Sequence, residues 1–227
     1  MEINSSRKII FHTEILPNYT KKALEALSKE SWLEQSGWYL AGGTALALQA
    51  GNRKSIDLDF FTQEAHFESV DLLTHFLNNK DWTLERDRGN MIFGELLGAK
   101  ISFIAYPFFI PKQEYIKYGS IKIIQPRDIA VMKIAAISQR GKKRDFFDLY
   151  WCAHHVESLL NIIKRLPEQY PSVAHDYHHI LKAIVYFNDA EGDPDPQVNF
   201  NADWKMVKSF FEKEIPLIVE KLILNSK

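Results

Sequence analysis

Two acidic residues, Asp57 and Asp59, alternate with the apolar residues Ile56, Leu58 and Phe60. In a β-strand, side chains two residues apart point to the same face, so both carboxylates are expected side by side, about 6–7 Å apart, with the apolar side chains in a core. Two carboxylates next to a buried strand are costly unless a cation lies between them. The pattern therefore predicts that Asp57 and Asp59 bind a magnesium ion.

A glycine pair, Gly42-Gly43, lies upstream, at the end of an apolar run and before a short helical segment. Glycines let the backbone approach a ligand closely, and the first amides of a helix carry a partial positive charge that favours phosphate. Thr44 and Ser55 add hydroxyl donors, and Arg53 can hold a phosphate through two parallel hydrogen bonds. These five residues predict a site for the phosphates of a nucleoside triphosphate.

Four charged residues lie downstream on two expected helices. Lys133 and Arg140 are seven apart and share a face of the first helix, while Asp145 and Asp148 are three apart on the second. We expect Lys133 to neutralise a phosphate, and Asp145 to position that phosphate by a charge pair or to take the proton from an attacking hydroxyl. Asp148, also assigned to the nucleotide-binding set, is expected to orient a basic side chain.

Paired acids next to groups that donate hydrogen bonds to a phosphate are typical of enzymes that transfer phosphoryl or nucleotidyl groups. The segments AGGTALAL, R-x-S-x-D-x-D-F-F and K-x6-R-x3-RD-x-x-D resemble the AbiEii/AbiGii toxin family of nucleotidyltransferases, in the polymerase-β-type superfamily. The resemblance touches residues 35 to 150, and Lys133, Arg144, Asp145 and Asp148 match family positions, with Arg144 where lysine is commoner.

The resemblance implies an activity and a set of partners. A magnesium-dependent nucleotidyltransferase would move a nucleoside monophosphate from a triphosphate to a hydroxyl of RNA, such as the 3' end of tRNA, or of a protein. The chain would be the toxin of a toxin–antitoxin pair, with a cognate antitoxin as its partner. The Lys142–Arg144 run could contact an RNA backbone, because such contact requires only charge and reach.

One expected site residue is missing from the sequence. Nucleotidyltransferases of this type take a third carboxylate from a neighbouring strand, and Ser102 stands at that position, with Glu95 as a candidate substitute. Serine is a poor magnesium ligand and no general base. The alternative interpretation is therefore a catalytically impaired nucleotide-binding or partner-binding module. A glycosyltransferase with an Asp-x-Asp site is disfavoured, because only 56 residues precede Asp57, less than the usual upstream nucleotide-binding domain.

The expected fold class is α+β (α/β), with a mixed β-sheet core, flanking helices and a C-terminal helical half. We predict a nucleotidyltransferase-like α/β core over residues 1–125 and a helical region over 126–227 that completes the cleft. Strands are expected at 38–40, 56–60, 82–86, 91–97, 100–106 and 121–124. Helices are expected at 20–35 with Thr20 as N-cap, 67–78, 126–140, 155–166, 172–187 and 204–224, the last interrupted by Pro216.

The composition of the chain limits its expected cellular compartment and its expected binding partners. The 28 basic and 29 acidic residues nearly cancel, so an RNA partner requires a local basic patch. No apolar run approaches the roughly 18 residues of a membrane span, and we expect no membrane partner. Cys152 stands alone, which excludes an intramolecular disulfide and a cysteine zinc site and favours the reducing cytoplasm.

Four groups of residues also have interpretations without chemistry. Lys133 and Asp145 could be an ordinary ion pair between two helices. The histidines 175, 178 and 179 are interpreted as a solvated helix face, and the acids of residues 188–196 as a solvated loop or an antitoxin contact. Four aromatic residues could stack on a base but are expected to pack in the core or to anchor loops: Tyr106, Phe108, Phe109 and Tyr115.

Overall fold

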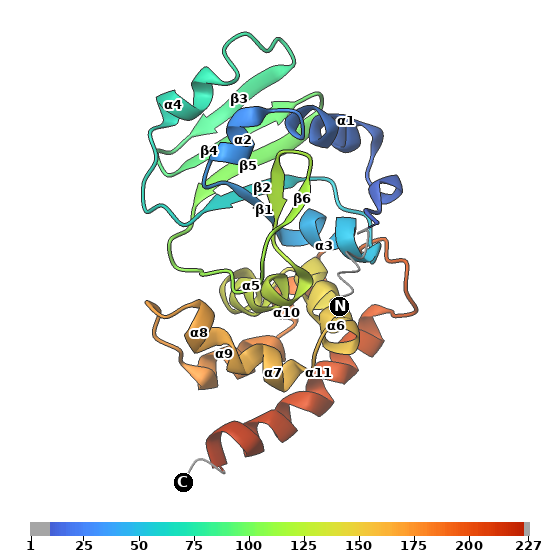
Figure 1. The fold of residues 1–227 in the computed structure, drawn as a ribbon. Helices are drawn as coiled ribbons and strands as arrows, with labels where there is room; N and C mark the ends of the chain where they lie inside the picture. Colours follow the sequence, from blue (N-terminus) through green and yellow to red (C-terminus); the bar gives the residue numbers. More distant parts are fainter. Residues whose placement is uncertain (1–9, 225–227) are drawn as a thin grey trace, which may run out of the picture.

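The computed structural model describes residues 10–224, and residues 1–9 and 225–227 lie outside the described part. A seven-stranded mixed sheet lies above a group of helices (Figure 1). The fold class predicted from the sequence is confirmed. The strands are β1 (Tyr39–Ala41), β2 (Leu58–Thr62), β3 (Trp82–Asp87), β4 (Met91–Leu96), β5 (Ala99–Ala105), β6 (Ile116–Tyr118) and β7 (Ile121–Ile123). The helices of the first half are η1 (Thr13–Ile15), α1 (Asn18–Leu27), α2 (Ser31–Gln35), α3 (Gly42–Ala50) and α4 (Ser69–Thr74).

The sheet places β2 at its centre. The strand order is β3-β4-β5-β2-β1-β7-β6, with β2 antiparallel to β1 and parallel to β5. Asp59 on β2 is therefore flanked by Ala41 on β1 and by Ser102 on β5. An acid in this register has a strand end on one side and a polar side chain on the other.

The alternation along β2 separates a core face from a polar face. Leu58 and Phe60 are fully buried, and the Phe60 ring stacks on Phe103 of β5 with 5.1 Å between ring centroids. Trp38 and Phe76 pack against the same Phe103 ring. This aromatic cluster holds β2 so that Asp59 faces the opposite side of the sheet.

The chain beyond residue 125 is helical. Its elements are α5 (Pro126–Arg140), α6 (Lys143–His155), α7 (Leu159–Lys164), α8 (Leu166–Gln169), α9 (Tyr177–Ile184), α10 (Asn188–Glu191), α11 (Trp204–Val219) and the π-helical turn η2 (Glu220–Leu224). Helix α5 has proline in its first turn and ends at Gly141, whose φ of 50° suits glycine. Both halves contribute to one hydrophobic core. The division at residue 125 thus marks a change of structure, and its status as a domain boundary stays a prediction.

A late segment of the helical half returns to the first half. The Asn199 amide donates to the Asn52 carbonyl at 2.8 Å, and the Lys54 amide donates to the Gln197 carbonyl at 3.0 Å. These bonds surround an isolated β-bridge between residues 53 and 198. Residues 197–199, which we call the return segment, therefore fix the backbone on both sides of Arg53.

Some expected elements differ from the structure. The helix expected at 20–35 is two helices, and Thr20 is not an N-cap, because it lies inside α1 and donates to the Ile56 carbonyl at 2.8 Å. Ile56 was expected in the core, but it precedes β2 and is 46% exposed. Pro216 lies within α11 and does not interrupt it. The helices expected at 67–78, 155–166 and 172–187 are shorter, at 69–74, 159–164 and 177–184.

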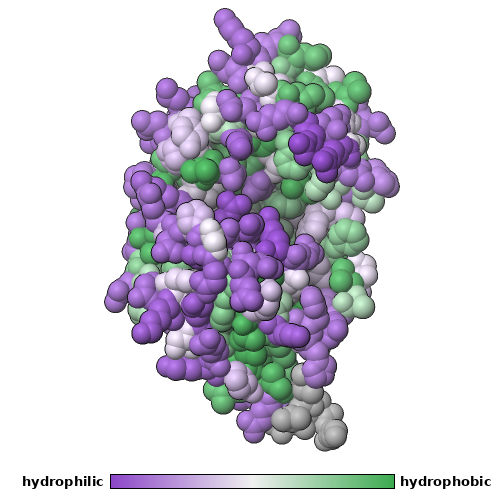
Figure 2. Space-filling view, turned by 180° about the vertical axis from the view of Figure 1, so that it is seen from behind, coloured by the Kyte–Doolittle hydropathy of each residue, from purple (hydrophilic) through white to green (hydrophobic). Residues whose placement is uncertain are grey.

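The surface seen from behind is mainly hydrophilic (Figure 2). Hydrophobic residues gather at the lower end of this view, over the helical half. Within the described residues, no helix combines the length and the apolar character that crossing a membrane requires.

Candidate active site

A cavity of about 290 Å³ separates the polar face of the sheet from helices α5 and α6. Both paired acids and both glycines line it, together with cations from the helical half. Seven of the residues predicted from the sequence line this cavity: Gly42, Gly43, Arg53, Ser55, Asp57, Asp59 and Lys133. Thr44, Asp145 and Asp148 are not among its lining residues, and they lie buried.

The two acids differ in their surroundings. Asp57 precedes β2, its side chain is 29% exposed, and its Oδ2 lies 3.5 Å from Nη1 of Arg144. Asp59 lies within β2, and burial raises the pKa of its carboxyl group, with Asp57 adding to the increase and a hydrogen bond from Ser102 opposing it. Asp59 has no ion-pair partner among the described residues. The charges of Arg144 and Lys133 act on this carboxylate from across the cavity, but neither residue forms an ion pair with it.

This arrangement fits a magnesium ion. Mg²⁺ prefers oxygen ligands and is commonly held by one or two carboxylates together with water and substrate phosphates. Asp57 and Asp59 supply two carboxylates in one cavity. No group of three or more metal-ligating His, Cys, Asp or Glu side chains occurs in the described part of the chain. The donor set suits an ion that arrives with a triphosphate better than one caged by the protein.

Ser102 lies where the sequence predicted it, beside Asp59 in the parallel β2–β5 register. Its hydroxyl donates to Oδ1 of Asp59 at 2.6 Å. Ser102 therefore orients the acid. The suggestion that Glu95 replaces the third carboxylate is wrong for this cavity, because Glu95 lies opposite Lys100 and is not among the lining residues.

The glycine pair makes room for the protein's own side chains. Gly42 has φ of +70°, and a Cβ there would lie 3.4 Å from Oδ2 of Asp59. A Cβ on Gly43 would collide with Nη2 of Arg53. Gly42 and Gly43 in the first turn of α3 still line the cavity, and the start of a helix favours an anion. The sequence predicted that a phosphate would lie close to the two glycines. In the structure, the side chains of Asp59 and Arg53 lie there.

Thr44 has a structural role. Its hydroxyl forms hydrogen bonds with Oγ of Ser55, at 2.8 Å, and with the Asp57 carbonyl. Thr44 is 2% exposed. The expectation that Thr44 donates to a phosphate is replaced by a link between α3 and the segment that leads into β2, while Ser55 keeps its place in the cavity wall.

A buried ion network lies behind the cavity. Arg53 donates from Nε and Nη2 to the two carboxylate oxygens of Asp148, each at 2.7 Å. Nζ of Lys133 lies 2.8 Å from Asp148 and 2.7 Å from Asp145, which also contacts Arg140 at 3.3 Å. The network therefore joins both helices of the K-x6-R-x3-RD-x-x-D segment to the loop after α3.

The network keeps its carboxylates ionised. Burial alone would raise the pKa of Asp148, but the charges of Arg53 and Lys133 and their hydrogen bonds lower it overall. The pKa of Asp145 is likewise lowered, because Lys133 and Arg140 outweigh the effect of burial. Burial alone would lower the pKa of Lys133, whereas Asp145 and Asp148 raise it. The buried groups are thus charged at neutral pH.

These contacts revise several predicted roles. The two-pronged contact of Arg53 is made to Asp148 and not to a phosphate. Asp148 does hold basic side chains, as expected, but it lies behind the wall and has no direct access to a nucleotide. Asp145 is fully buried and paired, which favours positioning over proton abstraction. Sequence reasoning missed Asn52, whose Nδ2 donates to Asp148 at 3.1 Å, and no spacing or motif marks it.

The basic run Lys142–Arg144 follows α5, and its residues lie in two different environments. Lys142 contacts Asp193 at 3.2 Å, and Lys143 is buried and contacts Asp195 at 2.9 Å. Glu191 also contacts Lys208 at 2.7 Å, so three acids of residues 188–196 are ion-paired within the chain, and an interpretation as a purely solvated loop is wrong. Of the Lys142–Arg144 run, Arg144 alone lines the cavity of the two acids.

Comparisons with known proteins show the family of this chain. A family model described as "Nucleotidyl transferase AbiEii toxin, Type IV TA system" matches residues 22–221. An uncharacterized protein of Aquifex aeolicus (strain VF5) is 34% identical over 206 residues, which cover 88% of this chain and 97% of that protein.

Two solved structures share the fold. MenT4, a nucleotidyltransferase toxin from Mycobacterium tuberculosis H37Rv, is 15% identical with a TM-score of 0.56, covering 90% of this chain and 86% of its own. A protein from H. pylori titled as a nucleotidyltransferase is 21% identical with a TM-score of 0.51, covering 91% and 96%. The match of the family model over most of the sequence shows that this chain belongs to the AbiEii family of nucleotidyltransferase toxins.

Proposed function

We propose that this chain is a magnesium-dependent nucleotidyltransferase that moves a nucleoside monophosphate from a triphosphate to a hydroxyl of RNA, such as the 3' end of tRNA, or of a protein. In the cell it would act as the toxin of a pair with a cognate antitoxin. The observation that carries the proposal is that Asp57, Asp59, the first turn of α3 and the cation Lys133 line one cavity.

The charges around the cavity suit a triphosphate. Lys133 has three N–H donors, of which two are directed to Asp145 and Asp148, so one remains for a ligand in the cavity that it lines. Arg140 and Arg144 are about half exposed and line the same cavity. A bound Mg²⁺ would supply neutralising charge for the phosphates at Asp57 and Asp59. The buried network would hold Lys133 in place before a ligand binds.

The absence of a third acid is compatible with catalysis. Phosphoryl and nucleotidyl transfer proceed with little covalent chemistry by the protein, so positioning and charge stabilisation supply most of the rate enhancement. Asp57 and Asp59 are the carboxylates that line the cavity among the described residues. We therefore propose that acceptor activation relies on placement next to these acids and not on a dedicated general base.

Transfer of radiolabel tests the function. The purified protein would be incubated with magnesium, total RNA and cell protein, and each of the four α-labelled triphosphates in turn. The wild type should label one acceptor class, and the Asp57→Asn, Asp59→Asn double variant should not, while Asp71→Asn, Asp81→Asn, which changes two exposed acids outside the cavity, should label normally. Equal labelling by the cavity variant would sink the proposal.

A second candidate, nucleotide binding without turnover, is favoured by Ser102 at the position of an expected acid. It would be identified by triphosphate binding that depends on Asp57 and Asp59 but releases no pyrophosphate with any acceptor. The same preparation serves both measurements, so the two candidates are separated directly.

A further inference from the structure

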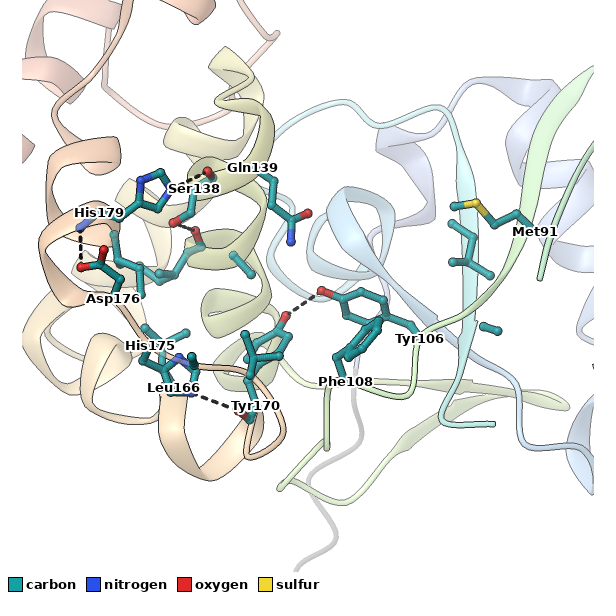
Figure 3. A pocket seen from close by; sticks show the side chains of 17 residues that line it. Met91, Tyr106, Phe108, Ser138, Gln139, Leu166, Tyr170, His175, Asp176 and His179 are labelled. Atoms are coloured by element: carbon teal, nitrogen blue, oxygen red, sulfur yellow. Dashed lines mark hydrogen bonds between the residues drawn. The ribbon is translucent and has the colours of Figure 1, made fainter. Parts of the chain in front are cut away.

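A second, larger cavity of about 610 Å³ adjoins the first, and Figure 3 shows the residues that line it. The two cavities share five lining residues: Met91, Ile104, Tyr106, Gln139 and Tyr170. Its lining is mostly apolar and aromatic and includes no lysine or arginine among the described residues. A space that adjoins the acids but carries no cation suits an uncharged, flat group better than a phosphate.

Aromatic rings form one end of this cavity. Tyr106 meets Phe108 edge to face, with 5.8 Å between centroids, and its hydroxyl donates to the Tyr170 hydroxyl at 3.4 Å. Figure 3 shows these three rings between the sheet and the helical half. Phe108 is 49% exposed although it lines the cavity, whereas Phe109 next to it is fully buried in the core, as predicted. Phe108 therefore presents apolar ring surface to an incoming group.

Polar groups lie opposite these rings. Gln139 projects from α5 at the junction of the two cavities, and its exposed amide has no hydrogen-bond partner in the described part of the chain. His179 contacts the Ser138 carbonyl at 3.3 Å, and its backbone amide donates to Asp176. An amide that can both donate and accept at the rim of an aromatic cavity matches the edge of a nucleobase.

The cavity lies on the opposite side of Asp57 and Asp59 from the glycine turn. In the strand order β4-β5-β2-β1, Asp59 lies on β2, the glycine turn follows β1, and Met91 and Ile104 lie on β4 and β5. Met91 and Ile104 are paired across these strands and share the face of Asp59. The glycine turn and the aromatic cavity are therefore on opposite sides of the acids.

In-line transfer requires the same separation. The attacking oxygen and the leaving pyrophosphate lie on opposite sides of the transferred phosphorus. If the first turn of α3 holds the pyrophosphate portion, the acceptor hydroxyl must approach from the side of Met91 and Ile104. The aromatic cavity is then where the residue that carries this hydroxyl would lie.

We propose that this cavity binds the 3'-terminal nucleobase of a single-stranded RNA acceptor, which stacks on Phe108 and Tyr106. The inference rests on the proposed function, because it takes the acids as the place of transfer. Stacking on aromatic side chains is typical of single-stranded RNA recognition. The base would fix the terminal ribose so that its hydroxyl points toward the cavity of Asp57 and Asp59.

The test compares two RNA probes in the absence of triphosphate, so that no turnover is required. One is a labelled single-stranded eight-nucleotide RNA, and the other is the same RNA with an abasic 3'-terminal nucleotide. Loss of the base should weaken binding to the wild type about tenfold or more. In Phe108→Leu and in Tyr106→Leu, Phe108→Leu the two probes should bind within about twofold of each other. Tyr115→Leu, which removes a comparably exposed ring outside the cavity, should keep the wild-type difference.

Triphosphate binding separates this proposal from its competitor. The affinities of the four triphosphates in magnesium, measured without RNA, should be unchanged in Phe108→Leu. Equal binding of the two RNA probes by the folded wild type, or no RNA binding, overturns the proposal. So does a loss of triphosphate affinity in Phe108→Leu with unchanged RNA binding, because the cavity would then hold the donor base. Base-dependent binding without any transfer of label would leave this cavity assigned and reject the proposed activity alone.

Discussion

Asp148 holds Arg53 through two parallel hydrogen bonds of 2.7 Å, although the two residues are 95 positions apart in the sequence. This pairing holds the Arg53 guanidinium next to Gly43, in the position that a side chain at residue 43 would need. Planar, two-pronged contacts between arginine and a carboxylate are strong and geometrically specific. The pair therefore fixes the position of the helical half relative to the glycine turn.

Loss of one member of this pair should be costly. Arg53→Ala is expected to lower the free energy of unfolding by about 3–5 kcal/mol, because Asp148 would keep a buried charge with one partner fewer. Arg53→Lys should cost less but remain measurable, since lysine cannot form the two-pronged contact. Urea unfolding checks both values. Arg86→Ala, at an exposed position without an ion pair among the described residues, should stay within about 0.5 kcal/mol of the wild type, and an equally small effect at Arg53 would contradict the role of the pair.

The same network predicts how stability changes with pH. The pKa values of Asp145 and Asp148 are lowered in the folded protein, so the unfolded chain takes up their protons first as the pH falls. Their contribution is complete well above the unfolded pKa of about 3.9, and it should be lost progressively as the pH falls from about 5 toward the lowered pKa values of the folded protein. Urea unfolding between pH 3 and 6 should show a shallower dependence in Asp148→Asn than in the wild type. Parallel curves would show that Asp148 is not linked to folding in this way.

Two glycines with the same backbone angle allow a matched test of the glycine turn. Gly42 and Gly89 both have φ of +70°, but a Cβ at Gly42 would meet Asp59 and one at Gly89 would meet nothing within 4 Å. Alanine at either position should cost about 1–2 kcal/mol of stability from backbone strain. Gly42→Ala should also reduce triphosphate binding severalfold, as measured by calorimetry, whereas Gly89→Ala should not. A similar loss of binding in both would attribute the effect to general destabilisation.

Ser102 should tune the affinity for magnesium. Its hydroxyl donates to Asp59, and partners of this kind typically change metal affinity about 10- to 100-fold when removed. Ser102→Ala is expected to shift the magnesium dependence of labelling to higher concentration by that factor, while Ser102→Thr, which keeps the hydroxyl, should resemble the wild type. An unchanged magnesium requirement in Ser102→Ala would mean that this hydrogen bond is irrelevant to the metal.

Without a metal ion, the ionised Asp59 that the proposed function requires should lower the melting temperature. In a chelator, Asp59→Asn is expected to melt at a higher temperature than the wild type, because burial raises the pKa of Asp59 and its ionised form is unfavourable without a cation. Magnesium with a triphosphate should raise the melting temperature of the wild type but not of Asp59→Asn. Asp81→Asn serves as the exposed control. If magnesium stabilised Asp59→Asn as strongly as the wild type, the ion would bind elsewhere.

The sequence predicted the parts of the site that depend on local periodicity. Alternation around Leu58 and Phe60 placed Asp59 on the polar face, because a strand repeats every two residues. The proline in the first turn of α5 and Gly141 after its last residue likewise marked the helix that carries Lys133. The cavity shared by these elements followed from the family resemblance more than from any single pattern.

Packing between segments distant in the sequence explains where the structure differs from the sequence-based predictions. Spacing shows which residues share a face of one element but not which distant side chain fills the space beside them. Arg53 suits a phosphate as well as a carboxylate, and only the fold shows that Asp148 takes that place. Ile56 continued the alternation in sequence, yet Thr20 binds its carbonyl from α1 and the strand begins two residues later.

The return segment has a consequence for the order in which the protein is made. A ribosome releases the acids Asp57 and Asp59 first, then Lys133 and Asp148, and the segment 197–199 that clasps the backbone beside Arg53 after all of these. Domains assemble as their chain emerges during synthesis. A chain that has emerged only a little beyond Asp59 therefore carries the acids without the clasp and the cations that complete their surroundings, so the finished cavity must wait until residues 197–199 have left the ribosome.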